Sequence, residues 1–372
     1  MNSNENNSSV SAIKRLVGCM LFLLIASRLI IGTSYLLRNA EVSRFNIVGI
    51  KSDTPLDMVY VGGSAAYVYW QPLRAWDEYG FTSYSLATNF VQAECLKSYI
   101  QWSEEFQNPE LYVIDARPFQ YYADLENEPA IRNGADSMDI FMSERYDLLD
   151  EYFNNRDIEY DTDILSYYLD LSKYHSNVDN LGNRDAWLLI DNNRENLYRG
   201  YQWNIDYECV NMPEDFHTER RAMPKGHSME ILADLLDYCQ ELNDKEFLFI
   251  ICPYEITKEH QMLYNTIQDA IEERGFVFLN ANDYYEEIGL DFTSDFYNNW
   301  HVNTFGASKY TVFLGGYICD HYNLPDHRSD PEYSSWNDAA TRFFEEDLIY
   351  QAQLIQFRRD YEAGILPEDD QE

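Results

Sequence analysis

The chain has 372 residues and a formal net charge of -37 at neutral pH. This length suits one large α/β domain with insertions or two modest domains. The charge excludes nucleic-acid binding, because a phosphate backbone requires a basic face. The six cysteines form no CxxC pair. We therefore expect no zinc or other metal site, no cofactor and no complete disulfide framework, and we interpret most cysteines as small buried residues.

A basic-flanked apolar segment at 14–38 follows a short tail at 1–13. It holds about 22 mostly apolar positions, enough to cross a bilayer as a helix. Arg28 interrupts the run, and the part before it, at 16–27, alone resembles a signal-peptide core. No small-x-small cleavage site follows, so an uncleaved anchor is favoured over a signal peptide or a buried soluble helix. Basic residues lie at both ends, so charge does not set the orientation.

Strands and helices then alternate from 45 to 325, which we predict as one α/β domain. Apolar runs predict strands at 57–63, 81–87, 110–116, 246–254 and 276–282. Helical spacing predicts helices at 72–79, 92–106, 228–242, 259–274 and 305–322. This alternation predicts a central parallel sheet with helices on both faces, in a flavodoxin-like three-layer α/β/α architecture.

Two regions depart from this alternation. Residues from about 121 to 225 are rich in Asp, Asn, Tyr and Arg, and we interpret them as a large insertion able to shape a cleft. The extension at 326–372 contains a further amphipathic helix, which packs either on the domain or on a partner.

A serine and a histidine far apart in the sequence are expected to meet at one edge of the sheet. "VYVGGSAAY" places Ser64 just past the first strand, and "NNWHVNTFG" places His301 in a loop before the last core helix. Parallel sheets carry their sites at the carboxyl ends of strands. Serine becomes a nucleophile when a neighbouring base takes its proton, and histidine suits that task. Alternatively, Ser64 caps the following helix and His301 bonds to backbone.

These stretches carry a family resemblance. "VYVGGSAAYVYWQPLRAWDEYGFTSYSLA" together with "DFYNNWHVNTFGASKYT" resembles the SGNH (GDSL-type) hydrolase superfamily. The closest likeness is to membrane-anchored bacterial members of the lipoteichoic acid D-alanylation type, over about 57–320. The resemblance implies a nucleophile at Ser64, whose N–H also serves the oxyanion, with Gly63 beside it as an oxyanion or substrate-binding residue, and a base at His301.

The residue that orients the histidine departs from the family pattern. Asn298 stands where the family has an aspartate, three residues before the histidine. An asparagine holds the ring but supplies no charge to an imidazolium. Asp295 or Asp291 takes over this task if the loop folds back, and otherwise caps a turn.

The expected oxyanion donors also differ. Ala87, at about the place of the family's glycine, offers a backbone N–H, and Asn89 offers a side-chain amide. The family's third-block asparagine is not evident. Arg117 in "IDARPF" follows the third strand instead, where it binds an anionic group or a developing oxyanion, or pairs with a carboxylate.

The resemblance implies a single-pass cell-membrane protein with an extracytoplasmic serine esterase or O-acyltransferase domain. It implies a cell-envelope glycan or teichoic acid as substrate, with a polytopic membrane-bound O-acyltransferase as partner. The negative charge fits neutral glycans better than polyphosphates. Two alternatives stay open: a plain carboxylesterase, and a catalytically degenerate binding or scaffold protein in an envelope acylation complex, which Asn298 favours.

Overall fold

The computed structural model describes residues 3–38, 42–120, 128–138, 142–154, 164–182 and 196–365. The chain divides into two compact units. One unit comprises Met1–Ala40 and Asp157–Asp191, and the other comprises Glu41–Arg156 and Asn192–Glu372.

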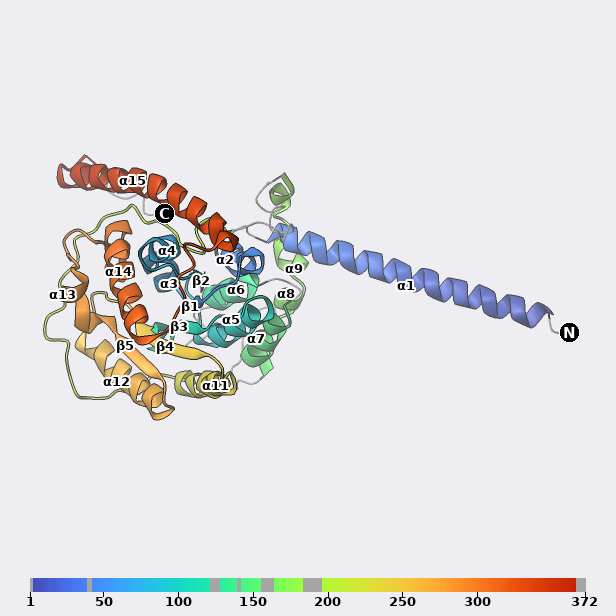
Figure 1. The fold of residues 1–372 in the computed structure, drawn as a ribbon. Helices are drawn as coiled ribbons and strands as arrows, with labels where there is room; N and C mark the ends of the chain where they lie inside the picture. The colour runs from blue at the N-terminus through green and yellow to red at the C-terminus, as the bar shows by residue number, and fades with distance from the viewer. Residues whose placement is uncertain are drawn as a thin grey trace. The chain divides into compact units, whose positions relative to one another are not determined.

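The larger unit is built on a five-stranded sheet in the order β2-β1-β3-β4-β5, with every neighbouring pair parallel (Figure 1). The strands are β1 (Met58–Gly62), β2 (Ser83–Ala87), β3 (Leu111–Asp115), β4 (Glu246–Ile251) and β5 (Val277–Asn280). The first three are buried along their whole length, as expected of parallel strands covered on both faces. The predicted α/β fold with a flavodoxin-like strand order is confirmed.

Helices cover both faces of this sheet. On one face α3 (Ser64–Tyr69) and α4 (Pro72–Tyr79) pack against α14 (Thr304–His321). On the other, α5 (Ala93–Phe106) packs against α11 (Ser228–Glu241), which contacts α12 (Lys258–Glu273). The remaining elements of this unit are α2 (Val42–Gly49), α6 (Glu128–Ser137), α7 (Ser143–Asn154), α13 (Tyr285–Ile288), α15 (Ser334–Glu362), β6 (Phe296–Asn298) and β7 (His301–Val302).

Local sequence explains the clearest boundaries. Helix α4 begins with Pro72, whose fixed φ suits a first turn, and ends at Gly80, whose φ of 88° is left-handed. The predicted helix at 72–79 is therefore confirmed at both ends.

The C-terminal helix α15 packs on the domain, where it contacts α4. Trp336 of α15 is fully buried, and its ring lies 5.4 Å from that of Trp76 in α4. Of the two alternatives for this extension, packing on the domain is therefore observed.

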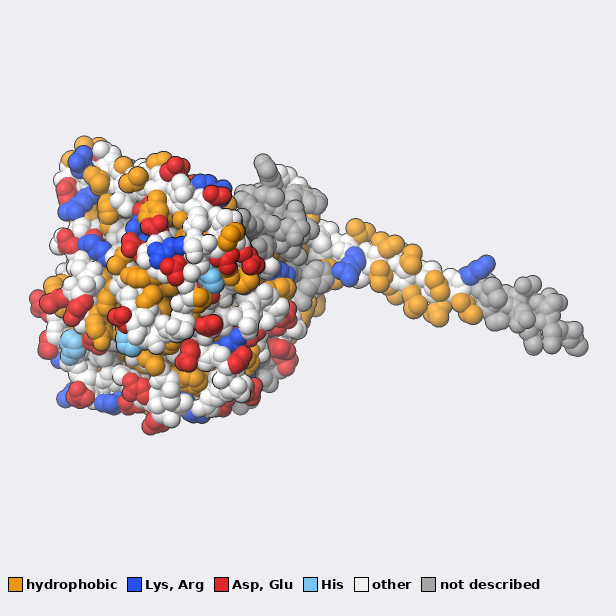
Figure 2. Space-filling model, viewed as in Figure 1, with side chains coloured by type: hydrophobic (Ala, Val, Ile, Leu, Met, Phe, Trp, Pro, Cys, Tyr) orange, Lys and Arg blue, Asp and Glu red, His pale blue; other side chains and the backbone are white. Residues whose placement is uncertain are grey.

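The smaller unit contains α1 (Ser3–Leu37), α8 (Leu165–Tyr168) and α9 (Leu171–Tyr174). Within α1, Ala12–Leu37 is long and apolar enough to cross a membrane, and a signal sequence has the same character. Figure 2 shows hydrophobic side chains along the visible face of α1. Arg38, just after α1, forms a buried ion pair with Asp170 at 2.7 Å.

The predicted insertion at 121–225 is divided between the two units. Residues 164–182 belong to the smaller unit with α1, whereas 128–138, 142–154 and 196–225 belong to the α/β unit. That these residues form one insertion able to shape a cleft stays a prediction. Residues 121–127, 139–141, 155–163 and 183–195 lie outside the described residues.

The cysteines also differ from expectation. All six are free thiols, and only three are buried: Cys95, Cys239 and Cys252. Cys19, Cys209 and Cys319 are exposed, so the interpretation of most cysteines as small buried residues is wrong for half of them.

Candidate active site

The site lies where the strand order reverses. Strand β1 has β2 on one side and β3 on the other, so the crossovers that leave β1 and β3 run in opposite directions. Open α/β sheets bind their ligands at such a switch point, beyond the carboxyl ends of the strands. Ser64 follows β1 and Arg117 follows β3, so both lie at this end of the sheet.

Two glycines form the turn from β1 into α3. A Cβ atom on Gly62 would lie 2.6 Å from Cβ of Asp115, closer than carbon atoms can approach. A Cβ on Gly63 would lie 3.1 Å from Cγ1 of Val91, a tight contact with a flexible side chain. The glycines are therefore explained by close packing, which brings Ser64 to the sheet edge as the first residue of α3.

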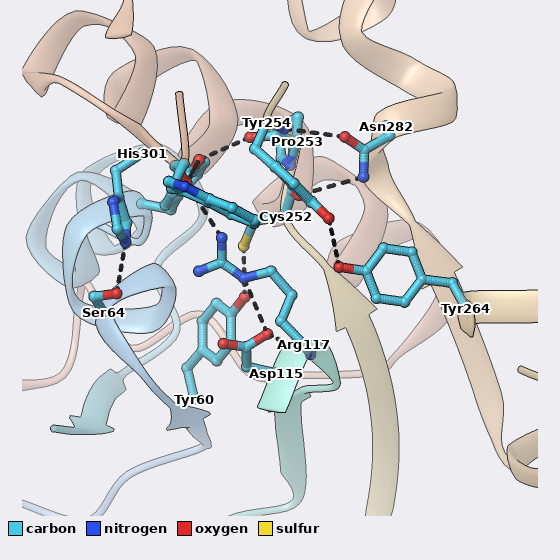
Figure 3. A network of polar contacts seen from close by, with 12 residues as sticks. Tyr60, Ser64, Asp115, Arg117, Cys252, Pro253, Tyr254, Tyr264, Asn282 and His301 are labelled. Carbon is cyan, nitrogen blue, oxygen red and sulfur yellow. Dashed lines mark hydrogen bonds and ion pairs between the residues drawn. The ribbon is translucent and has the colours of Figure 1, made fainter. Parts of the chain in front are cut away.

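The structure brings Ser64 and His301 together. Oγ of Ser64 lies 2.6 Å from Nε2 of His301, although 237 residues separate them in the sequence (Figure 3). Both side chains are half-buried. This distance is within hydrogen-bond reach, as a nucleophile and its base require.

Asn298 orients the imidazole from the other side. Its Oδ1 lies 3.1 Å from Nδ1 of His301 and also accepts the backbone N–H of Trp300 at 2.9 Å. The Trp300 N–H requires the oxygen of the amide at this position. Nδ1 of His301 must then carry the proton, which leaves Nε2 as the acceptor for the Ser64 hydroxyl. Asn298 thus selects the tautomer that a general base needs, without a charge.

A short hairpin presents the histidine, where the sequence had indicated only a loop. Strands β6 and β7 are antiparallel, and Asn298 pairs directly with His301 across the turn. Asn303 anchors this hairpin. Its Oδ1 caps α14 by accepting the N–H of Phe305, and its Nδ2 donates to the carbonyls of Ser294 and Phe296.

The Asp295 carboxylate bonds to groups other than the His301 imidazole. Its Oδ2 accepts from Nζ of Lys309 at 2.6 Å and from the N–H of Asp291 at 2.8 Å. Asp291 in turn accepts from the N–H and hydroxyl of Thr293. Of the two roles proposed for Asp295, the structure shows the structural one: both aspartates stabilise the loop that leads to the hairpin.

The electrostatic environment keeps His301 neutral. Burial, and then the positive charge of Arg117, lower the pKa of His301 to about 3. The ring of Tyr297 stacks on the imidazole, with centroids 5.3 Å apart. A neutral imidazole with a free Nε2 is the form that accepts a proton from serine.

Arg117 is buried beside the pair. Its backbone N–H donates to Oδ1 of Asp115 at 3.0 Å, and its Nε lies 3.6 Å from the same oxygen. Its Nη1 donates to the carbonyl of Trp300 at 3.2 Å. The predicted pairing with a carboxylate is therefore observed, with Asp115 as the partner, a residue that the sequence analysis missed.

One of the predicted oxyanion donors, the Ala87 N–H, is directed elsewhere. The Ser85 N–H bonds to the Arg199 carbonyl on the outer side of β2. Amides two residues apart in a regular strand face the same way, so the Ala87 N–H also points away from β1. Ala87 is therefore not retained as a donor, and the predicted role of Gly63 stays a prediction.

Asn89 lies in an exposed turn after β2, and its carbonyl accepts a hydrogen bond from the side chain of Asn133. Its predicted side-chain role stays a prediction. Within the described ranges, no group of three or more His, Cys, Asp or Glu side chains is arranged to hold a metal ion.

No family model matches the chain. A search of curated proteins finds no match either. The resemblance to SGNH hydrolases therefore depends on the sequence motifs alone. The distances between Ser64, His301 and Asn298 do not depend on that resemblance. A serine hydroxyl, a neutral imidazole that accepts its proton, and an amide that fixes the tautomer are together suited to nucleophilic acyl transfer.

Proposed function

We propose that this protein is a membrane-anchored serine esterase or O-acyltransferase of the SGNH type. The observation that carries the proposal is the 2.6 Å contact between Ser64 Oγ and His301 Nε2, with Nδ1 held by Asn298. The sheet topology supports it, because Ser64 follows β1 at the switch point, the place where α/β folds bind ligands, and His301 contacts it there.

The proposed reaction proceeds in two steps. Ser64 Oγ attacks the acyl carbon of an ester while Nε2 of His301 takes the hydroxyl proton, and the departing alkoxide then receives that proton. The acyl group is left as an ester on Ser64. Water or a sugar hydroxyl attacks this ester, loses its proton to His301 and restores Ser64. Hydrolysis and transfer differ only in this acceptor.

The developing oxyanion needs donors near Ser64. We propose the backbone N–H of Ser64 and the guanidinium of Arg117, with Asn89 as a further contributor. Arg117 extends from the end of β3 toward this side of the site (Figure 3). A cationic donor held by Asp115 suits a site whose base is uncharged.

The substrate and location are proposed on the resemblance and on α1. With α1 as an anchor, the α/β domain lies outside the cytoplasm and acts on a cell-envelope glycan or teichoic acid. A polytopic membrane-bound O-acyltransferase is the proposed acyl donor. Figure 2 shows acidic side chains spread over the visible surface, and the net charge of -37 favours neutral glycans over polyphosphates.

The direct test is intact-mass spectrometry of the full chain in detergent after reaction with a fluorophosphonate. We expect a single adduct that is lost in Ser64→Ala and strongly reduced in His301→Ala. Ser335→Ala and His321→Ala alter exposed residues of α15 and α14 and should label like the wild type.

The outcomes separate the candidate functions. A labelled protein that hydrolyses p-nitrophenyl esters rapidly is a carboxylesterase, whereas slow hydrolysis accelerated by sugar acceptors indicates a transferase. A folded wild-type protein that forms no adduct would contradict the proposal. It would favour a degenerate binding protein, the function suggested by the uncharged Asn298.

A further inference from the structure

A buried ion pair connects the two halves of the candidate site. Asp115 is 1% exposed at the end of β3, where it packs against the glycine turn that precedes the nucleophile. A Cβ atom on Gly62 would lie 2.6 Å from Cβ of Asp115, and one on Gly63 would lie 3.8 Å from its Oδ2. The same carboxylate accepts the Arg117 N–H and faces the guanidinium. One end of the pair is therefore fixed to the turn that carries Ser64.

The other end reaches the base. Nη1 of Arg117 donates to the carbonyl of Trp300, the residue before His301. The guanidinium carbon lies 6.0 Å from the ring centroid of Tyr69 and 5.8 Å from that of Tyr254. Both rings are within the range in which an aromatic face attracts a cation.

We propose that Asp115 and Arg117 are positioning residues that tie the Ser64 turn to the His301 hairpin and so set the distance between nucleophile and base. The inference rests on the proposed function. It differs from the oxyanion role of Arg117, because here Arg117 acts through the Trp300 carbonyl and through its charge.

Tyr69 provides an internal comparison. Its hydroxyl, on the helix that begins with Ser64, lies 3.0 Å from the same Trp300 carbonyl oxygen and 2.7 Å from that of Pro253, and its one proton is available to either. Tyr69 and Arg117 therefore both contact the Trp300 carbonyl, but only Arg117 brings a positive charge. Removing either weakens the tie, whereas removing Arg117 also removes the cation near His301.

The charges around the base make this difference measurable. The elements packed against β7 carry titratable groups, among them Tyr67 and Tyr69 on α3, Tyr297 on β6, and Lys309 on α14, which pairs with Asp295. Arg117, which pairs with Asp115, and Asp206, which acts on Tyr297, are further charged groups around the site. Burial raises the pKa of the three tyrosines, so they stay neutral across the range in which an imidazole titrates. Arg117 is the cation whose charge opposes protonation of His301.

The experiment compares Arg117→Gln, Arg117→Lys and Tyr69→Phe in the full chain in detergent, with folding checked by circular dichroism. The first readout is the pH titration of the His301 Cε1–H signal in ¹³C-histidine-labelled protein, assigned with His301→Ala. The second is the rate of fluorophosphonate labelling at Ser64 as a function of pH.

We expect Arg117→Gln to raise the His301 titration midpoint by about one pH unit or more, because a neighbouring cation is lost. Arg117→Lys and Tyr69→Phe should keep the low midpoint. All three should label Ser64 more slowly, by about 10²-fold for Arg117→Gln, because a base displaced by about 1 Å loses that much. Asp115→Asn should also slow labelling without raising the midpoint.

A midpoint in Arg117→Gln equal to that in Tyr69→Phe would overturn the inference. The inference would also be overturned if Arg117→Gln alone labelled Ser64 more slowly. That result would indicate that Arg117 is an oxyanion donor and does not hold the hairpin. If the wild type forms no adduct, the proposed function fails, but the titration still decides whether Arg117 controls the state of His301.

Discussion

The nucleophile and the base are held in different ways. Ser64 follows a fully buried strand and begins a helix, so the sheet itself fixes its position. His301 lies on a short hairpin outside the central sheet, where side-chain hydrogen bonds from Asn298 and Asn303 and the Arg117 contact hold it. Main-chain packing therefore secures the serine, and polar side chains secure the histidine. Substitutions near Ser64 should damage the fold, while those near His301 should alter reactivity with less unfolding.

The largest effect is expected from Gly62→Ala. Its Cβ would lie 2.6 Å from Cβ of Asp115, and both residues lie on packed strands. Overpacking of this kind costs about 1–3 kcal/mol. We expect loss of unfolding free energy by denaturant titration together with loss of Ser64 labelling. Gly63→Ala is the matched control, because the Val91 side chain can move to make room for the new Cβ atom. An equal loss of unfolding free energy in both variants would argue against close packing as the reason for Gly62.

On the histidine side, Asn303→Ala removes a helix cap and both ties from α14 to the hairpin. Loss of a cap costs about 1 kcal/mol. We expect Asn303→Ala to lower the free energy of unfolding by this amount. The rate of Ser64 labelling should fall by a larger proportion. Asn303→Asp keeps the cap but loses the two amide donors, so it should retain most stability yet label slowly. Normal labelling in Asn303→Asp would show that the hairpin needs no such tie.

Asn298→Asp should sharpen the comparison by improving the base. A carboxylate at this position still accepts from Nδ1 of His301 and from the Trp300 N–H, and it adds a negative charge that raises the His301 pKa. The base is active when neutral, so the low pKa lets the wild type label Ser64 well below pH 6, the ordinary range of histidine. In Asn298→Asp the acid limit should move upward and the plateau rate should rise about tenfold. A lower rate at every pH would indicate that the asparagine is required.

The smallest effect is expected from Lys309→Met. Lys309 is 39% exposed, and it bonds to Asp295, which also accepts from the Asp291 N–H. The Asp295 carboxylate is buried, but without Lys309 it keeps the Asp291 N–H and the Ser294 hydroxyl as donors, so the loss of one donor should cost about 1 kcal/mol. We expect a slightly lower melting temperature and an unchanged pH dependence of labelling. A shift in the pH profile would revive Asp295 as a group that acts on His301.

The sequence by itself determined the order of strands and helices, the ends of α4, the apolar N-terminal helix and the candidate pair. These depend on local signals: buried strands are written as apolar runs, Pro72 and Gly80 delimit a helix, and topology sends residues that follow parallel strands to one edge. Ser64 and His301 could therefore be predicted together without knowing a distance.

Only the tertiary structure decided which polar atoms meet. Asp115 pairs with Arg117, Asp295 bonds to Lys309, and Arg117 reaches the carbonyl before His301. The physical reason is that a buried polar group takes the partner that packing brings within about 3 Å, and sequence patterns carry no information on that scale. The same reason explains why Asn298 can serve: the Trp300 N–H that fixes its amide becomes visible only when the hairpin is folded.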